Sequence, residues 1–362
     1  MILVDKLEEI RRKIDAMDAK ILGALGERVY LAKEIGEYKR SVGLPVTDPA
    51  REHKVIQKIG DNAARSGLPR EGVEEVYEGI IRLCRSVQIE ETKIAFLGPR
   101  GTFCEQAARE YFHNANATFE EKPSITDVFR SVEVQETDRG IVPAENSNEG
   151  SVVLTLDLLK DTDLKISGEI ILHISHNLIV KPDMTLSDIS QVSSHPQALA
   201  QCRRYLDENL PKANRLEVHS TAGAVKMASE SHNVAAIGTE LSAQLYGMKV
   251  LASGIEDDRN NQTRFFVLGT EDQEPTGNDR TTITFSVKHT PGSLHEALGT
   301  LSSRMINLSR IESRPARSKP WEYVFFCDFE GHRKNTNCQD ALEELRRKTT
   351  DLKILGSYPR AQ

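Results

Sequence analysis

Two cations near the start of the chain have residue types and a spacing that could bind a small anion. Arg28 interrupts a line of apolar residues that recurs every third or fourth position from Leu7 to Val42. A buried guanidinium is costly unless an anion meets it, so Arg28 in this line favours a ligand site. Lys39 lies ~16 Å further along the same helix and ~20° around it, so the two cations could bracket one small molecule.

The elements expected to position these cations are three helices. The apolar line over 7–42 has the spacing of a coiled-coil seam, in a helix over ~50 Å long that two short helices cannot cover alone. We therefore expect this helix to pair with a second copy of the chain. Asp48-Pro49 predicts an N-cap and the start of a second helix. A third helix, from about residue 70, has an inner line of Ile80, Cys84 and Gln88. Each residue taken alone also fits an ordinary bundle with solvated cations, and that alternative stays open here.

The cations belong to a larger set that resembles the active site of the all-helical chorismate mutases. The residues that match that family's pattern at the same spacings are Arg11, Arg28, Lys39, Asp48, Arg51, Glu52 and Gln88. The resemblance implies an intertwined dimer in which Arg11 crosses into the partner's site. Position 84, often a serine in the family, is Cys84 here.

The resemblance also implies how these residues would act on chorismate, which rearranges to prephenate in a pericyclic step without a nucleophile or an acid. Arg11 and Arg28 would bind the two carboxylates. Lys39, with Gln88 or Glu52 beside it, would stabilise charge on the breaking ether oxygen. Glu52 would donate there only if it is protonated. The other expected substrate-binding residues of this module are Asp48, Arg51 and Cys84.

Five loops in the middle of the chain carry small hydroxyl and amide residues after strand-like runs. They are 98–102, 142–147, 193–197, 219–221 and 262–266. The first could hold a carboxylate at a helix start, but it is neither a dinucleotide fingerprint nor a Walker loop. Strand ends of this kind in two α/β lobes predict a cleft for a small polar anion.

The order and content of these loops resemble prephenate dehydratase from Gly98–Thr102 through Glu145–Gly150 to Thr263-Arg264-Phe265, the family's catalytic signature. The resemblance implies a bilobal fold similar to the type II periplasmic binding proteins, with the active site between the lobes. Prephenate loses carbon dioxide and its ring hydroxyl, which requires neither a metal nor an organic cofactor. By this resemblance Thr263 would donate a hydrogen bond to the leaving hydroxyl, and Arg264 would bind an anion.

A rival proton donor in this module is His195, whose reference pKa is near neutrality. A histidine in a Ser-His-Pro turn is more often a structural hydrogen-bond partner, so both roles stay open. The other expected substrate-binding residues are Thr102, Asn146, Ser147, Ser194, Gln201, Thr221 and Phe265.

The last module begins with the strand-like run 281–287 and continues in a βαββα-type order. It resembles the ACT domain of prephenate dehydratases, whose two motifs form a phenylalanine site at a subunit interface. The matching residues are Gly292, Ser293, Leu294 and His295, then Glu312, Ser313, Arg314 and Pro315. Ser293 stands where the family usually has alanine. The alternative is a plain ferredoxin-like interaction domain.

Length and composition fit this division into three modules. A length of 362 residues allows several domains. Shifts in composition predict an all-helical module over 1–91, two α/β lobes over 92–270 and a ferredoxin-like α+β domain over 280–358, with a linker at 271–280. A net charge of -7 without a Lys/Arg run argues against nucleic acid, and no apolar run reaches a membrane-spanning length. The 5 cysteines form no C-x-x-C pair, so we expect a reducing cytoplasm and no metal site.

The sequence therefore predicts a bifunctional enzyme of phenylalanine biosynthesis, at least a homodimer, that converts chorismate to prephenate and prephenate to phenylpyruvate under feedback inhibition by L-phenylalanine. One alternative is a mutase fused to an NAD-dependent prephenate dehydrogenase, but no G-x-G-x-x-G follows a candidate strand. A second alternative is a non-catalytic sensor of aromatic amino acids built on a binding-protein fold.

Overall fold

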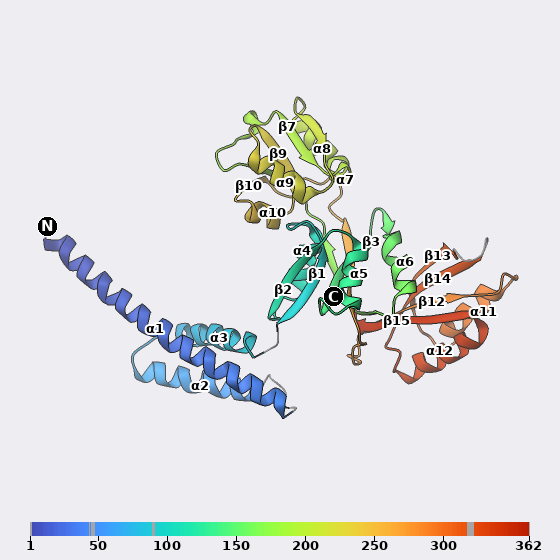
Figure 1. The fold of residues 1–362 in the computed structure, drawn as a ribbon, viewed down its shortest axis with the longest axis horizontal. Helices are drawn as coiled ribbons and strands as arrows, with labels where there is room; N and C mark the ends of the chain where they lie inside the picture. Colours follow the sequence, from blue (N-terminus) through green and yellow to red (C-terminus); the bar gives the residue numbers. More distant parts are fainter. Residues whose placement is uncertain (1, 43, 45–47, 89–90, 317–321, 362) are drawn as a thin grey trace. The chain divides into compact units, whose positions relative to one another are not determined.

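The computed structural model describes residues 2–42, 44, 48–88, 91–316 and 322–361, and the chain divides into two compact units. The first unit, called here the helical unit, comprises the chain up to Thr92 with the short segment Asn114–Ala117, and the second comprises the rest. Figure 1 traces the elements in chain order. The predicted fold class is confirmed: helices come first, two α/β lobes follow, and an α+β domain ends the chain. Among the described residues, no helix is both long and apolar enough to cross a bilayer.

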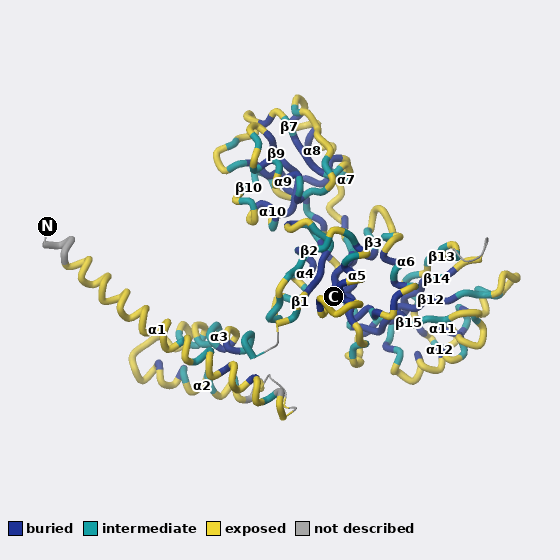
Figure 2. The backbone as a smooth tube through the Cα atoms, in the orientation of Figure 1, coloured by how far each residue is buried: buried dark blue, intermediate teal, exposed yellow. Residues whose placement is uncertain are grey.

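The helical unit consists of α1 (Ile2–Ser41), α2 (Pro49–Arg65) and α3 (Arg70–Ser86). As predicted, Asp48 is the N-cap of α2, where its carboxylate accepts a hydrogen bond from the backbone N–H of Arg51 at 2.9 Å. The apolar seam of α1 is exposed in both halves of the helix, and Figure 2 shows most of α1 coloured as exposed. Its side chains from Leu7 to Ile21 are 47–64% exposed. A second apolar surface is needed to cover them.

The first lobe is built on a six-stranded sheet in the order β2-β1-β3-β11-β5, with β4 paired to β3. Its strands are β1 (Thr92–Leu97), β2 (Ala117–Lys122), β3 (Arg139–Asn146), β4 (Gly150–Ser151), β5 (Lys165–His173) and β11 (Gln262–Gly269). Its helices are α4 (Phe103–Tyr111), α5 (Ile125–Glu133) and α6 (Val153–Asp161). The central strands are rich in buried Val, Ile and Phe, because both faces of this sheet are covered.

The second lobe is inserted between β5 and β11 and has a sheet in the order β10-β6-β9-β7-β8. Its strands are β6 (Asn177–Val180), β7 (Gln191–Ser194), β8 (Asn214–Glu217), β9 (Val234–Gly238) and β10 (Lys249–Ala252). Its helices are η1 (Leu186–Asp188), α7 (Pro196–Gln201), α8 (Arg203–Asn209), α9 (Thr221–Glu230) and α10 (Glu240–Leu245). The chain crosses between the lobes at 174–176 and again at 253–261, and both crossings border the cleft described below.

The C-terminal domain has an antiparallel sheet in the order β13-β14-β12-β15. Its elements are β12 (Asp279–Ser286), α11 (Ser293–Ser302), β13 (Leu308–Pro315), β14 (Tyr323–Glu330), α12 (Thr336–Lys348) and β15 (Asp351–Pro359). The strand β15 was not predicted from the sequence, so the expected βαββα order lacked its last strand. The predicted linker at 271–280 was also too long, because Asp279 and Arg280 already belong to β12.

The C-terminal domain shares a hydrophobic core with the first lobe. One face of its sheet is covered by its own helices, and the other contributes Phe326 and Tyr358 to the cluster that contains Ile166 and Phe266. At Gly356 on β15, a Cβ atom would lie 2.1 Å from the carbonyl oxygen of Ile166, so only glycine permits this approach. Around this shared core, the two parts therefore pack as closely as a domain interior does.

Candidate active sites

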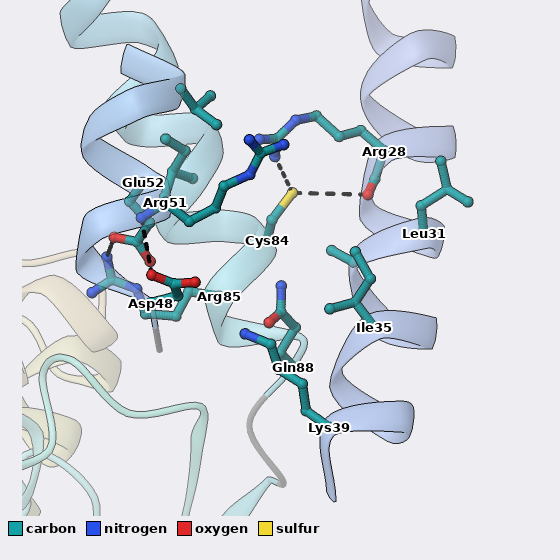
Figure 3. A pocket seen from close by; sticks show the side chains of 13 residues that line it. Arg28, Leu31, Ile35, Lys39, Asp48, Arg51, Glu52, Cys84, Arg85 and Gln88 are labelled. Atoms are coloured by element: carbon teal, nitrogen blue, oxygen red, sulfur yellow. Dashed lines mark hydrogen bonds and ion pairs between the residues drawn. The ribbon is translucent and has the colours of Figure 1, made fainter. Parts of the chain in front are cut away.

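The helical unit contains a cavity of about 280 Å³ that gathers seven of the predicted residues (Figure 3). They are Arg28, Lys39, Asp48, Arg51, Glu52, Cys84 and Gln88. The sequence pattern predicts Ile80 and Gln88 on the inner line of the third helix, but α3 buries Ile81 and ends at Ser86. Gln88 reaches the cavity because α1 has Gly36 where a Cβ would lie 2.8 Å from the Cα atom of Gln88.

Arg28 lies at the side of the cavity formed by α1, where it meets Cys84. Its Nη1 donates to the Cys84 Sγ atom at 2.6 Å, and Cys84 is only 4% exposed. The guanidinium thus has a thiol as its partner, and no carboxylate of the described residues forms an ion pair with it. A neutral partner leaves the positive charge available to an anionic ligand.

Glu52 forms an ion pair that the sequence analysis did not anticipate. Its Oε2 accepts a hydrogen bond from Nη2 of Arg85 at 2.5 Å, and Arg85 lines the same cavity. Arg85 is adjacent to Cys84 in sequence, but whether it faces the cavity depends on how α3 is rotated. Among the described residues that line the cavity, four are cations, namely Arg28, Lys39, Arg51 and Arg85.

Arg11 lies outside this cavity. It pairs with Glu8 one turn earlier on α1 at 2.9 Å, and its side chain is 61% exposed. Its predicted role requires a second chain, so it stays a prediction.

The second unit contains a cleft of about 350 Å³ lined by residues of both lobes. Seven residues singled out from the sequence meet there, namely Thr102, Asn146, His195, Gln201, Thr221, Thr263 and Phe265. Among the described residues that line it, none is arginine or lysine. The polar groups that line it are hydroxyl groups, amides, histidines, the Glu149 carboxylate and the N-terminal ends of α4 and α9.

The loop 98–102 is less open to a ligand than its sequence indicated. Thr102 is the N-cap of α4, as expected, but the backbone N–H of Gly101 already donates to the buried Glu105 carboxylate at 2.6 Å. The N–H of Arg100 donates to Glu121 at 2.8 Å. Thr102 itself, rather than these two N–H groups, faces the cleft.

Thr263 is oriented by Asn146, which lies opposite it where β11 pairs with β3. The Asn146 Oδ1 accepts hydrogen bonds from the backbone N–H groups of Asn148 and Glu149, so its Nδ2 must point the other way. This Nδ2 donates to the Thr263 Oγ1 at 2.9 Å and to Asn261 Oδ1 at 2.7 Å. Because the Thr263 oxygen accepts a hydrogen bond, its own hydrogen is left to donate.

His176 and Asn261 complete this polar cluster, and the sequence analysis missed both. The buried His176 has its Nε2 2.9 Å from Gln201 Oε1 and its ring 5.6 Å from that of Phe103. Burial lowers the pKa of His176 below its ordinary value, against a smaller opposing effect of Gln201, so the ring is neutral near pH 7. Both residues lie on the segments that cross between the lobes. No sequence motif marks these segments, so neither residue could be recognised as part of the site.

His195 also lines the cleft, and it is the N-cap of α7. Its Nδ1 accepts a hydrogen bond from the backbone N–H of Gln197 at 3.3 Å. The tautomer that accepts at Nδ1 carries its proton on Nε2. The structural role foreseen for His195 is thus present, together with a position in the cleft.

Three predicted substrate-binding residues lie outside the cleft. Ser194 is fully buried and donates to the carbonyl oxygen of Ile237 at 2.8 Å. Ser147 accepts from the backbone N–H of Gln262 at 3.0 Å, which closes the loop. Arg264 is the main correction, because side chains alternate along β11 and its neighbour Thr263 takes the cleft side.

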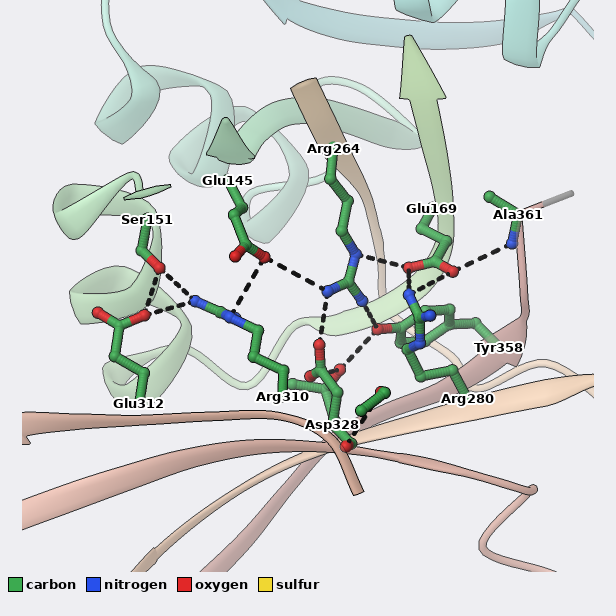
Figure 4. A network of polar contacts seen from close by, with 12 residues as sticks. Glu145, Ser151, Glu169, Arg264, Arg280, Arg310, Glu312, Asp328, Tyr358 and Ala361 are labelled. Atoms are coloured by element: carbon green, nitrogen blue, oxygen red, sulfur yellow. Dashed lines mark hydrogen bonds and ion pairs between the residues drawn. The ribbon is translucent and has the colours of Figure 1, made fainter. Parts of the chain in front are cut away.

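Arg264 points to the C-terminal domain and is almost buried (Figure 4). Its guanidinium contacts Glu169 at 2.6 Å, Asp328 at 2.5 Å and the Tyr358 hydroxyl at 2.9 Å. Burial alone would lower the pKa of Arg264, but Tyr358, Asp328 and Glu169 together raise it. The arginine is therefore a permanent cation that joins β5, β11 and the C-terminal sheet.

The two motifs of the C-terminal domain lie on different elements. Gly292 has φ +87° and is the N-cap of α11, whose first turn contains Ser293, Leu294 and His295. The second motif ends β13, where Glu312 and Arg314 are half-buried while Ser313 and Pro315 are exposed. Glu312 accepts a hydrogen bond from Ser151 of β4, and Arg314 lies 3.4 Å from Asp157 of α6.

Comparison with known proteins agrees with this arrangement of sites. Residues 10–89 match the family model of chorismate mutase type II, 94–273 match prephenate dehydratase, and 281–347 match the ACT domain. A bifunctional chorismate mutase/prephenate dehydratase of Aquifex aeolicus is 42% identical over 361 residues, or 99% of this chain and 99% of that protein.

Two solved structures resemble the second unit. The prephenate dehydratase in complex with L-Phe from Arthrobacter aurescens is 37% identical with a TM-score of 0.68, over 74% of this chain and 90% of that chain. GqqA, described as a novel type of quorum quenching acylase, is 29% identical with a TM-score of 0.68, over 74% of this chain and 97% of that chain. The chain therefore belongs to the bifunctional chorismate mutase/prephenate dehydratases, and it is an enzyme with a chorismate mutase domain, a prephenate dehydratase domain and an ACT domain.

Proposed function

We propose that the helical cavity rearranges chorismate to prephenate and that the cleft converts prephenate to phenylpyruvate, carbon dioxide and water. The corresponding domains are 1–91, 92–270 and 280–358. The separate positions of the two sites support two independent activities in one chain.

In the mutase site, Arg28 and Arg51 bind the substrate carboxylates, and Arg11 of a second copy completes the site. Asp48 caps α2 and so fixes the start of the helix that carries Arg51. Cys84 accepts a hydrogen bond from Arg28 and so holds the guanidinium in place, which a weakly polar thiol can do.

We assign the hydrogen bonds to the breaking ether oxygen to Lys39 and Gln88. Glu52 accepts a hydrogen bond from Arg85, so its carboxyl group is engaged with that arginine rather than with the ether oxygen. The substrate carries the negative charges, and the surrounding cations stabilise the charge that develops on oxygen during the rearrangement.

In the dehydratase site, Thr263 donates to the ring hydroxyl of prephenate. The bond from the ring to its carboxylate breaks, and its electron pair enters the ring as carbon dioxide leaves. The C–O bond to the ring hydroxyl then breaks, and its electron pair leaves with the oxygen. That oxygen takes the proton of the Thr263 hydroxyl, which solvent replaces, so the leaving group departs as water. The single observation that supports this assignment is the hydrogen bond from Asn146, which leaves the Thr263 hydrogen free to point at the substrate.

The two carboxylates of prephenate bind at the N-terminal ends of α4 and α9, beside Thr102 and Thr221. Helix N-termini carry partial positive charge, which suits a cleft lined by neither arginine nor lysine among its described residues. Gln201 and Phe265 shape the cleft around the ring. His195 is the second candidate donor, because its Nε2 proton also lies on a residue of the cleft.

L-phenylalanine is the proposed effector of the C-terminal domain, where Gly292–His295 and Glu312–Pro315 bind it between two chains. The L-Phe complex of the related prephenate dehydratase supports this choice. The half-exposed seam of α1 supports a homodimer. Five buried cysteines without disulfides support a cytoplasmic enzyme.

The test is to add chorismate to the purified chain without NAD and to follow prephenate and phenylpyruvate. Formation of both products is expected, as is inhibition of the second step by L-phenylalanine. Prephenate that accumulates without phenylpyruvate would contradict the assignment of the cleft.

A further inference from the structure

The β3–β4 hairpin reaches from the cleft to the C-terminal domain. Across it, Glu145 pairs with Ser151 and Asn146 pairs with Gly150. Because side chains alternate along a strand, Asn146 lines the cleft while Glu145 lines a different cavity, against the C-terminal domain. A displacement of the hairpin would therefore move the amide that orients Thr263.

Arg310 of β13 contacts both strands of this hairpin (Figure 4). Its Nε lies 3.3 Å from Oε2 of Glu145, and its Nη2 donates to Ser151 Oγ at 2.5 Å. Only 10% of the Arg310 side chain is exposed, so its guanidinium is largely shielded from solvent, whereas 36% of the Glu145 side chain is exposed.

The same guanidinium is shared with Glu312. Nη2 of Arg310 lies 2.6 Å from Oε2 of Glu312, which also accepts a hydrogen bond from Ser151. Two carboxylates, Glu145 and Glu312, thus compete for one arginine. Nη1 of Arg310 is buried without a hydrogen-bond partner among the described residues. A buried donor without a partner is unfavourable. The Arg310 guanidinium can therefore shift when a ligand binds one of its two carboxylate partners.

The neighbouring strand β11 is held mainly by residues outside the hairpin. Arg264, next to Thr263, is held by Glu169 and Asp328, and its Nη1 is 4.0 Å from Glu145. A shift of Arg310 would therefore move the hairpin relative to β11, and the contact between Asn146 and Thr263 spans these two strands.

We propose that Arg310 is the positioning residue through which an amino-acid effector controls the dehydratase cleft. The proposal rests on the proposed phenylalanine site at Glu312. The ammonium group of the effector pairs with Glu312, Arg310 then moves toward Glu145, and the hairpin carries Asn146 away from its position at Thr263. By linkage, prephenate and L-phenylalanine each weaken the binding of the other.

The decisive variant is Glu145→Gln in the full-length chain, because it alters the hairpin end of the link and leaves the residues of β13 unchanged. L-phenylalanine should bind with a Kd within about threefold of the wild-type value by calorimetry, while its effect on dehydratase kcat/KM falls below about twofold. The double variant Glu145→Gln/Arg310→Gln should show no further loss of inhibition, because both changes break one link.

The matched control is Arg304→Gln, which breaks an ion pair with Glu344 within the C-terminal domain at 2.6 Å. This variant should keep wild-type inhibition. Full inhibition in Glu145→Gln would overturn the proposal, and so would a loss of L-phenylalanine binding that matches the loss of inhibition. A wild-type chain that does not bind L-phenylalanine would instead refute the proposed effector site, and the link with it.

Discussion

The substitution Asn146→Asp tests how the dehydratase site orients its donor. Aspartate has the shape of asparagine, and one of its oxygens can keep the hydrogen bonds from the N–H groups of Asn148 and Glu149. The other oxygen then stands 2.9 Å from the Thr263 Oγ1, where the wild-type chain has a donor. The Thr263 hydroxyl must now donate to this carboxylate and is withdrawn from the substrate.

The expected loss is that of one positioned donor. Such a loss lowers kcat by about 10²–10³-fold, or ~2.7–4 kcal/mol of transition-state stabilisation. Thr263→Ala should fall in the same range, because it removes the same hydrogen bond. The new negative charge should also raise the KM for prephenate, which is itself an anion. Asn146→Ala is the milder comparison, since it frees the hydroxyl without drawing it away.

The assay is steady-state conversion of added prephenate, with near-ultraviolet circular dichroism to check the fold. The double variant Asn146→Asp/Thr263→Ala should be no slower than either single variant, because the two changes remove one interaction. A kcat for Asn146→Asp within about threefold of wild type would refute the reasoning, and so would additive losses in the double variant.

Four further predictions concern other parts of the chain. Arg28→Ala should lower mutase turnover of chorismate by at least ~100-fold and leave conversion of added prephenate unchanged, and equal loss of both would show a shared site. Glu52→Gln should change mutase kcat by less than ~10-fold, because Glu52 is engaged with Arg85 and does not donate to the ether oxygen. Because the pKa of His176 is lowered on folding, the folded state is favoured above the unfolded pKa of about 6.5, and this stabilisation is lost as the pH falls. The melting temperature should therefore fall less on acidification in His176→Gln than in the wild type. Gly292→Val should weaken L-phenylalanine binding about tenfold in calorimetry, because φ is +87° there, whereas Gly299→Ala on the same helix should not.

The helical cavity could be predicted largely from local patterns. The seam of α1 and the cap at Asp48 depend on spacing along one helix, and spacing is written in the sequence. Arg85 could not be found in this way. Its position depends on the rotation of α3, and a rotation of one residue, about 100°, separates the expected Ile80 from the buried Ile81.

The cleft was predictable as a set of loops but not as a set of side-chain directions. Thr263 and Arg264 are neighbours on a strand with both faces buried, so hydropathy does not tell which side faces the substrate. The answer depends on Asp328 and Tyr358, which lie more than sixty residues later in the chain. His176 was missed for a related reason, since its importance comes from Gln201 and Phe103, which only the fold brings near.

Because the first lobe and the C-terminal domain share a core, the modules seen in the sequence are not the units in which the chain folds. The polar stretch after Gly269 looks like a place to divide the protein, yet a chain ending there would expose Ile166 and Phe266 to water and leave Glu169 without Arg280. Cooperative unfolding should therefore join these two modules in one calorimetric transition, while the helices before Thr92 melt in another. A chain that lost its C-terminal domain would need polar substitutions on the exposed hydrophobic surface before it could be a stable enzyme without feedback inhibition.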